Sequence, residues 1–278
     1  MPSTPGDPDN ALAGVRAVLL DLDGVLYVED EPIAGAVDAV RRLREAGLDL
    51  RLVTNTTSRP RRMIVEHLER LGFDVAAGDV VTPAALAVRH CLEADKGRVA
   101  LVMNDAVKED FTELEEVAEG AQAVIVGDLG SAFGYDVLNR AFRAVMDGAQ
   151  LVALQKNRFW LTPDGLSLDV GPFVAALEYA TGREAFVFGK PAAGFFATVL
   201  GGLGVDPTAA VMVGDDVESD VGGALGAGLA GVLVRTGKYR EDAVRASDIH
   251  PTAIVDSIVD IPALLRPDSA DTPGPSTS

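Results

Sequence analysis

The sequence predicts an α/β protein in which a doubly wound parallel sheet is interrupted by a second, smaller α/β domain. β-Branched and leucine-rich runs alternate with helical patterns from residue 15 to residue 72, and the alternation resumes at residue 185. Such alternation is typical of βαβ units on a parallel sheet. A separate series of strands and helices lies between the two stretches, and a chain of 278 residues is long enough for two domains.

Both stretches of the main domain are expected to supply strands to one sheet. In the first, a strand over residues 15–20 precedes a helix over 36–46, and a strand over 48–53 precedes a helix over 60–71. After the insert, the pattern predicts strands over 185–188, 209–213 and 232–234, helices over 193–203 and 219–225, and a short strand and helix between 254 and 265. The helices over 36–46, 60–71, 193–203 and 219–225 are each followed by glycine, which commonly terminates a helix.

The inserted region has its own α/β pattern. It predicts strands over 99–103, 123–126 and 151–153, a helix over 135–146, and a hairpin through 158–162 and 165–169. We therefore divide the chain into a tail (1–13), a discontinuous core domain (14–78 and 184–266), an inserted domain (79–183) and a second tail (267–278). Both tails are rich in Pro, Asp, Ser or Gly without apolar periodicity, so we expect them to be disordered.

Composition excludes several classes of function. With 42 acidic against 24 basic residues, the net charge is −18, which argues against nucleic acid as a partner. No apolar run approaches the ~20 residues that span a bilayer, and the first residues do not resemble a secretion leader, so we expect a cytoplasmic protein with no membrane partner. One cysteine and three scattered histidines cannot form an internal disulfide or a usual zinc site, so any metal must be held by oxygen.

Two carboxylates lie at the end of the first predicted strand. Asp21 and Asp23 follow an apolar run directly, and the carboxyl ends of parallel strands are where ligands bind. The segment does not fit a calcium loop, because Gly24 follows Asp23 before a third oxygen ligand. Taken alone, it is as compatible with a surface turn as with a site.

Polar residues also follow the strands over 48–53 and 185–188. Thr54 and Asn55 offer a hydroxyl and free N–H groups before a helix, which suits a phosphate, although helix capping also accounts for them. Lys190 stands in Gly-Lys-Pro, which lacks the flanking residues of a Walker motif and is also compatible with a surface lysine.

An acidic cluster follows the strand over 209–213. Its members are Asp215, Asp216, Glu218 and Asp220. A helix N-terminus favours acids, which accounts for Asp216 and Glu218 but not for Asp215 at the strand edge. A nearby Gly-x-Gly-x-x-Gly match at residues 226–231 precedes a strand instead of following one, so we interpret it as a turn and not as a dinucleotide site.

In chain order, these motifs resemble those of the haloacid dehalogenase (HAD) superfamily of Mg-dependent phosphatases: Asp-x-Asp-Gly-Val-Leu, Thr-Asn, Gly-Lys-Pro and Gly-Asp-Asp-x-x-x-Asp, each after a predicted strand. The resemblance spans residues 15–265 and implies a Rossmann-like core with an inserted C2-type α/β cap, as in the NagD-like subfamily IIA. Stretches 171–181 and 234–239 look most similar to the branch that contains phospholysine phosphohistidine inorganic pyrophosphate phosphatase.

The resemblance implies catalytic and metal-binding roles for three aspartates. Asp21 would be the nucleophile that forms an aspartyl-phosphate, and Asp23 would act first as an acid and then as a base. Mg²⁺ would be held by Asp21, the backbone carbonyl of Asp23, and Asp215, because a hard cation prefers oxygen ligands. The role of Asp216 is left open.

The remaining motif residues would bind or support the phosphoryl group. Thr54, the N–H of Asn55 and Lys190 would contact its oxygens, where charge sits during the reaction. Asp220 would orient Lys190 or a metal-bound water. The resemblance thus implies a phosphatase that acts on a small phosphorylated substrate beneath the cap, chiefly phosphomonoesters, with pyrophosphate or N–P compounds as secondary candidates. A homodimer is compatible with this assignment.

Two other functions are kept as alternatives. A receiver-like signalling module also has an acidic pocket, a phosphorylated aspartate, a threonine and a lysine, but it predicts one domain of about 120 residues with the acidic pair first. A phosphomutase of the same superfamily would keep Asp21 and Asp23 with a smaller cap. A catalytically inactive binding protein would lack a motif residue, and none is missing.

Overall fold

A six-stranded parallel sheet forms the larger part of the molecule. The computed structural model describes residues 12–162 and 165–265, and the strand order of this sheet is β15-β14-β13-β1-β4-β5. Its strands are β15 (Ala253–Val255), β14 (Ala230–Val234), β13 (Ala210–Gly214), β1 (Ala17–Asp21), β4 (Asp49–Val53) and β5 (Val80–Val81). Every neighbouring pair is parallel, so the predicted α/β fold with a parallel sheet is confirmed.

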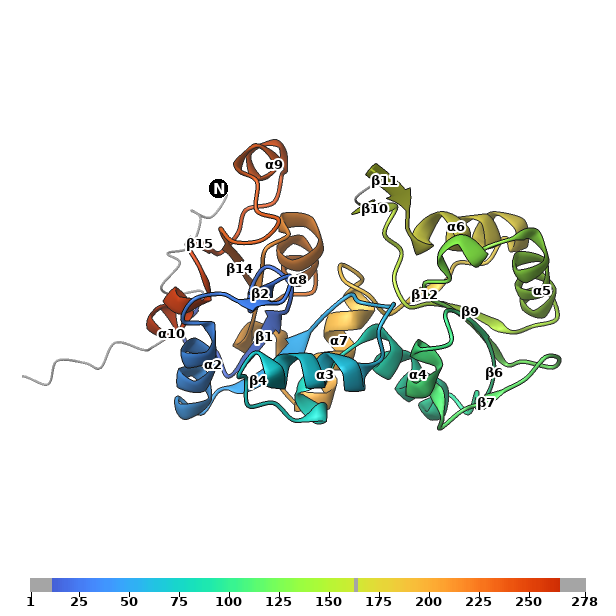
Figure 1. Ribbon diagram of the computed structural model, residues 1–278, viewed down its shortest axis with the longest axis horizontal. Coiled ribbons are helices and arrows are strands. Elements are labelled where there is room, and N and C mark those ends of the chain that lie inside the picture. The colour runs from blue at the N-terminus through green and yellow to red at the C-terminus, as the bar shows by residue number, and fades with distance from the viewer. Residues whose placement is uncertain (1–11, 163–164, 266–278) are drawn as a thin grey trace, which may run out of the picture.

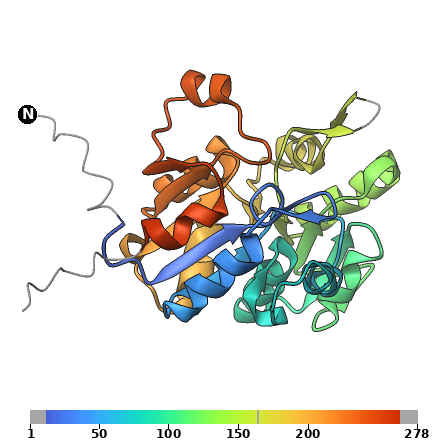
Figure 2. The same cartoon turned by 60° about the vertical axis from the view of Figure 1, so that its left-hand side comes forward.

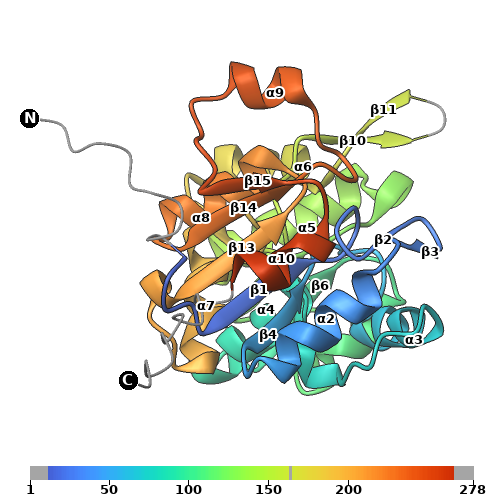
Figure 3. The same cartoon turned by 90° about the vertical axis from the view of Figure 1, so that its left-hand side faces the viewer.

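Helices cover both faces of this sheet (Figures 1 and 3). On β1, Val18 and Leu20 pack toward α2 and α3, whereas Ala17 and Leu19 pack toward α4 and α7. These helices are α2 (Ala36–Glu45), α3 (Arg61–Arg70), α4 (Pro83–Glu93) and α7 (Ala193–Leu203), with the shorter α8 (Gly223–Gly226), α9 (Glu241–Ala246) and α10 (Ile261–Leu264) nearer the C-terminus. Because successive strand residues point to opposite faces, a strand buried on both faces reads as a continuous apolar run.

The inserted domain has its own parallel sheet, at the right of Figure 1, with the order β12-β9-β8-β6-β7. Its strands are β12 (Phe186–Val187), β9 (Gln150–Ala153), β8 (Ala123–Val126), β6 (Arg98–Val102) and β7 (Glu115–Glu116). The helices α5 (Tyr135–Met146) and α6 (Val170–Thr181) cover one face. We call this domain the cap.

The two domains share a hydrophobic core. One packed cluster contains Leu19 of β1, Phe196 of α7 and Ile125 of β8, with α4 residues such as Ala87 among them. Figure 1 shows α4 and α7 between the two sheets, and Figure 2 gives a second view of the two domains. The cap is thus packed against the core domain and is not a separate body on a linker.

The chain passes from the core sheet to the cap sheet, and back, at residues other than those predicted from the sequence. β5 pairs with β4 in the core sheet, although the insert was expected to begin at residue 79. β12 pairs with β9 in the cap sheet, so the expectation that the strand over 185–188 belongs to the core sheet is wrong. Both strands have only two residues, too few for a sequence pattern to indicate a partner.

Other local features were not expected. The helices α4, α6 and α9 had no counterpart in the sequence analysis, and Leu12 is buried although the N-terminal tail was expected to reach residue 13. The rest of that tail, residues 1–11, and the tail from 267 lie outside the described residues. Within the described ranges, no helix combines the length and apolar character needed to cross a membrane.

Two hairpins extend beyond the sheets (Figure 3). The short one, β2 (Tyr27–Val28) with β3 (Glu31–Pro32), follows the Asp-x-Asp motif at residues 21–23. The other, β10 (Phe159–Thr162) with β11 (Gly165–Leu168), projects from the cap and is antiparallel, as predicted.

Candidate active site

Lys190 is a buried cation held between two aspartates. Its Nζ lies 2.6 Å from Asp21 Oδ1 and 2.7 Å from Asp220 Oδ1, and its side chain is 1% exposed. The contact with Asp21 is a hydrogen bond, whereas the one with Asp220 is an ion pair without hydrogen-bond alignment. Asp21 ends β1, Lys190 follows β12, and Asp220 lies in the π-helix Val217–Gly222 after β13.

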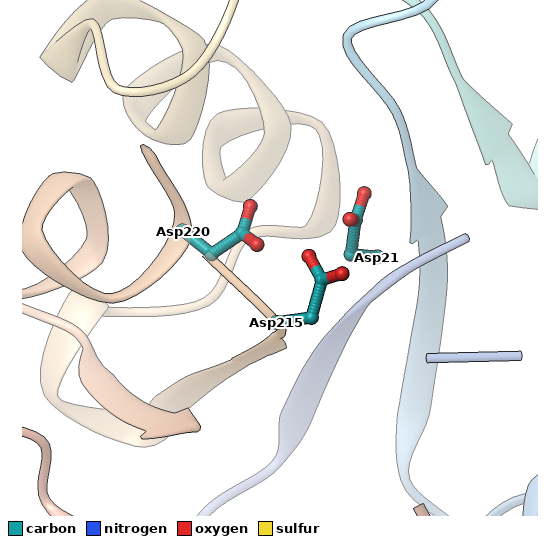
Figure 4. A group of neighbouring side chains, drawn as sticks. All are labelled: Asp21, Asp215 and Asp220. Carbon is teal, nitrogen blue, oxygen red and sulfur yellow. The ribbon is translucent and has the colours of Figure 1, made fainter. Parts of the chain in front are cut away.

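Asp215 completes a cluster of three carboxylates. Figure 4 shows Asp21, Asp215 and Asp220 directed toward one another, and one oxygen of each lies within 4.8 Å of the others. Asp215 Oδ2 accepts a hydrogen bond of 2.7 Å from the N–H of Lys238. Asp215 Oδ1 is buried and has no hydrogen-bond partner. A buried, unpaired carboxylate oxygen is costly unless a ligand completes it.

The site carries an excess of negative charge. Burial raises the pKa of the Asp215 carboxyl to about 6, although the N–H and the charge of Lys238 act in the opposite direction. Burial also raises the pKa of Asp220 to about 6, against the charge of Lys190. Burial disfavours the Lys190 ammonium, but the charges of Asp21 and Asp220 outweigh burial and raise its pKa. Lys190 therefore stays charged at neutral pH.

Two glycines allow the backbone to close around Asp215. Gly24 has a φ of +82°, and a Cβ at this position would lie 2.0 Å from Asp215 Oδ2. Gly237 has a φ of +64°, and its Cβ would lie 2.1 Å from the same oxygen. Only glycine adopts such a backbone without strain and leaves room for the carboxylate.

The Asn55 side chain holds the backbone of Lys190. Asn55 Nδ2 donates to the carbonyl of Lys190 and Asn55 Oδ1 accepts from its N–H, both at 2.8 Å. The sequence analysis assigned only the N–H of Asn55, as a phosphate ligand, and did not foresee this clamp. The Asn55 side chain thus holds Lys190, which carries the buried ammonium and lies 135 positions later in the sequence.

Thr54 and Asp23 are less closely tied to the carboxylate cluster. Thr54 is buried after β4, and its hydroxyl donates to Thr56 Oγ1 at 2.9 Å and accepts from the N–H of Thr56. Asp23 is exposed in the turn between β1 and β2. Asp23 is therefore open to solvent and to an incoming ligand, while Asp21 lies deeper.

Comparison with known proteins identifies the family. A haloacid dehalogenase-like hydrolase family model matches residues 18–116, and a HAD-hydrolase-like model matches residues 187–261. Human haloacid dehalogenase-like hydrolase domain-containing protein 2 is 44% identical over 230 residues, which cover 83% of this chain and 88% of that protein. The chain belongs to the HAD superfamily. Human phospholysine phosphohistidine inorganic pyrophosphate phosphatase is 40% identical over 255 residues, 90% of this chain and 92% of that protein.

This HAD protein has the fold of NagD from E. coli K-12, which aligns with a TM-score of 0.79 and 23% identity, covering 88% of this chain and 98% of that one. The p-nitrophenyl phosphatase from Archaeoglobus fulgidus aligns with a TM-score of 0.83 and 26% identity, covering 90% of this chain and 98% of that one. The glycerol phosphate phosphatase from Mycobacterium tuberculosis, solved in complex with magnesium, aligns with a TM-score of 0.75 and 31% identity, covering 93% and 78%. The chain is a HAD phosphatase of subfamily IIA with a cap domain, and not a single-domain receiver module.

Within this HAD site, three residues have roles that the sequence analysis missed or left open. The Asp216 side chain caps the π-helix, accepting from the N–H groups of Glu218 and Ser219, which answers the question left open for Asp216. Lys238 follows β14, so the strand-end rule could have found it. Tyr27 is buried beside Asp23, and its hydroxyl contacts the Asp23 carboxylate. Burial, together with the charges of Asp23 and Asp21, raises the pKa of the Tyr27 hydroxyl.

Proposed function

We propose that this protein is a Mg²⁺-dependent phosphatase that hydrolyses small phosphomonoesters through an aspartyl-phosphate on Asp21. The observation that carries the proposal is the buried Lys190 ammonium, held between Asp21 and Asp220 beside the unpaired oxygen of Asp215. A carboxylate and a phosphate dianion repel each other, so attack on phosphorus needs cations in this position.

The donor set fits a hard divalent cation. The three carboxylates outnumber the cations beside them, Lys190 and Lys238, so a net negative charge remains for a cation to offset. Asp21, Asp215 and the backbone carbonyl of Asp23 would hold Mg²⁺, with Asp215 Oδ1 as a ligand. When bound, the ion lowers the charge of the phosphoryl oxygens and so favours nucleophilic attack. The Mycobacterium tuberculosis relative is described in complex with magnesium, which supports this choice.

The proposed reaction has two displacements at phosphorus. In the first, an Asp21 oxygen bonds to phosphorus while the bond to the leaving oxygen breaks, and Asp23 donates a proton to that oxygen. In the second, Asp23 takes a proton from water, whose oxygen bonds to phosphorus as the bond to Asp21 breaks. The exposed position of Asp23 is consistent with exchange between leaving group and water.

The phosphoryl oxygens would be bound by Lys190, the N–H of Asn55 and the hydroxyl of Thr54. Lys190 is buried, so its charge acts with little screening by solvent. Asp220 pairs with Lys190 and, through Oδ2, accepts from the N–H of Asp216, which fixes its carboxylate. We therefore assign Asp220 to positioning Lys190 and not to contact with substrate.

The substrate class is proposed to be small phosphorylated molecules. A cap over a strand-end site excludes bulk water and large surfaces. The cap hairpin carries Arg158 at its start and Trp160 in β10, which would contact the leaving group. The name of the human phospholysine phosphohistidine inorganic pyrophosphate phosphatase supports testing pyrophosphate and N–P compounds as well.

Hydrolysis of 4-nitrophenyl phosphate tests the proposal. We expect turnover that stops on removal of divalent cations, returns with Mg²⁺, and is lost in Asp21→Asn, whose side chain keeps the shape without the nucleophile. Ser131→Ala, on the cap surface, serves as a control and should keep the wild-type rate. Turnover by Asp21→Asn at the wild-type rate, or full activity without divalent cations, would contradict it.

A further inference from the structure

Gln155 is a buried polar residue whose side chain joins the two ends of the cap hairpin. It is 3% exposed and follows β9. Gln155 Oε1 accepts from the N–H of Asn157, two residues before β10, and Nε2 donates to Asp169 Oδ1, the residue after β11, each at 2.5 Å. Because both of its polar atoms are used, a single side chain spans the base of the hairpin.

The same residue lies beside the segment that carries the buried cation. β9 and β12 are parallel, with Val152 opposite Phe186 and Ala153 opposite Val187, which places Gln155 next to Gly189. A Cβ on Gly189 would lie 2.8 Å from Gln155 Cβ, so the two backbones are in close contact. Lys190 is the next residue. Gln155 therefore connects the hairpin to the reaction centre by a short, buried path.

Further contacts hold the hairpin at its base, where the N–H of Asp169 donates to the carbonyl of Arg158 and Lys156 Nζ pairs with Glu178 of α6. Asp169 Oδ1 also caps α6 by accepting from the N–H of Val170, and Gly171 donates to the carbonyl of Asn157. Four apolar side chains of the hairpin face solvent: Phe159, Trp160, Leu166 and Leu168 are each more than half exposed. An exposed two-stranded hairpin has little stability of its own, so its orientation depends on its base.

We propose that Gln155 is a specificity-determining positioning residue, which sets the orientation of the β10–β11 hairpin relative to Lys190 and thereby the choice of leaving group. The inference rests on the proposed function, since it concerns the substrate pocket of the phosphatase. Gln155 does not touch the reacting atoms in this account. It acts through the hairpin.

Trp160, the only tryptophan of the chain, reports on the hairpin without any need for activity. We expect Gln155→Ala to lower the fluorescence anisotropy of Trp160, because a hairpin freed at its base moves on the nanosecond scale. Gln122→Ala is the matched control: this glutamine also bonds two backbone groups, the N–H of Arg98 and the carbonyl of Asp95, at the other side of the cap. It should leave the anisotropy unchanged.

Kinetics with two activated substrates supply the second measurement. Acetyl phosphate and 4-nitrophenyl phosphate both have good leaving groups, and we expect the larger nitrophenyl group, rather than the acetyl group, to contact the hairpin. We expect Gln155→Ala to lower kcat/KM for 4-nitrophenyl phosphate roughly tenfold relative to acetyl phosphate, as for the loss of about one hydrogen bond. An equal loss on both substrates, or unchanged Trp160 anisotropy, would overturn the proposal.

A rescue variant separates positioning from a general loss of stability. Gln155→Glu places a carboxylate against Asp169, so it should disturb the hairpin at least as much as Gln155→Ala. Adding Asp169→Asn lets the new amide nitrogen donate to the new carboxylate, which restores the bond between residues 155 and 169 with reversed polarity, while the carboxylate at 155 still accepts from the N–H of Asn157. The nitrogen takes the place of the oxygen that caps α6, so this cap is not restored. The double variant should regain the wild-type anisotropy and substrate ratio, and no recovery would count against the proposal. A wild-type protein without phosphatase activity would defeat the proposed function, while the anisotropy still tests the role of Gln155.

Discussion

Removing the Asn55 side chain should weaken catalysis only through Lys190. Asn55→Ala keeps the backbone N–H proposed to bind phosphate and removes the two 2.8 Å hydrogen bonds that hold the Lys190 backbone. At about 0.5–1.5 kcal/mol for each bond, the loss is roughly 1–3 kcal/mol. If all of this free energy is lost from the interaction of the Lys190 ammonium with the transition state, kcat/KM falls by about 5- to 150-fold.

The assay is a double-mutant cycle on 4-nitrophenyl phosphate at saturating Mg²⁺. When Lys190→Ala has already removed the ammonium, adding Asn55→Ala should cost less than about twofold, because two residues that act as one unit are not additive. Asn104→Ala is the control: this cap asparagine also makes two hydrogen bonds, to Asp128 and Val107, and should leave kcat/KM unchanged. Thermal unfolding is measured for each variant, since Lys190→Ala leaves buried carboxylates without their cation.

The reasoning fails if Asn55→Ala lowers kcat/KM as much in the Lys190→Ala protein as in the wild type. Such additivity would mean that the Asn55 side chain contacts substrate directly. A wild-type rate for Asn55→Ala alone would mean that the two hydrogen bonds do not determine where the ammonium lies.

Three further predictions follow from the same structure. Gly24→Ala should lose most Mg²⁺-dependent activity, because its Cβ would meet Asp215. The control is Gly47→Ala, whose φ is +79° but which has open space around it, so it should cost only about 1–2 kcal/mol of stability. Equal activity losses in the two variants would contradict the steric argument. Mg²⁺ should raise the melting temperature, and at 100 times Kd the gain is about 2.7 kcal/mol; no shift would refute binding to the folded state. Burial raises the pKa of the Cys91 thiol, so the native protein should react with a disulfide reagent at pH 8 far more slowly than free cysteine, and rapid labelling would show that Cys91 is accessible.

The fold was largely predictable because central strands such as β1, β8 and β13 are continuous apolar runs. The helices over 135–146 and 193–203 have the bounds expected from their patterns, the second ending at Gly204 in the left-handed region. Helix α4 was overlooked although a signal existed: Thr82 caps it by accepting from the N–H of Ala85, and Pro83 stands at its first position. The sheet membership of β12 had no such signal, since it depends on tertiary packing.

Part of the candidate site could likewise be predicted from the sequence, and part could not. Asp21 and Asp215 could be brought together from the sequence because both follow apolar strands, and parallel strands end at one edge of the sheet. The strand-end rule also reaches Lys238 after β14, but not the fact that its backbone N–H bonds Asp215. The clamp of Asn55 on Lys190 could not be predicted, because no sequence pattern indicates which backbone groups a side-chain amide will bond. The π-helix after β13, which brings Asp220 to Lys190, was expected as an ordinary helix starting at residue 219.

Trapping the covalent intermediate tests the central claim most directly. In Asp23→Asn, 4-nitrophenyl phosphate should still phosphorylate Asp21, because its leaving group needs little help from an acid, while hydrolysis slows without the base. The acyl phosphate should then accumulate, and borohydride should convert it to homoserine at position 21, as read by peptide mass spectrometry. Homoserine at position 21, absent without substrate, is the predicted result. Turnover with an unmodified Asp21, or a modified residue elsewhere, would contradict the account.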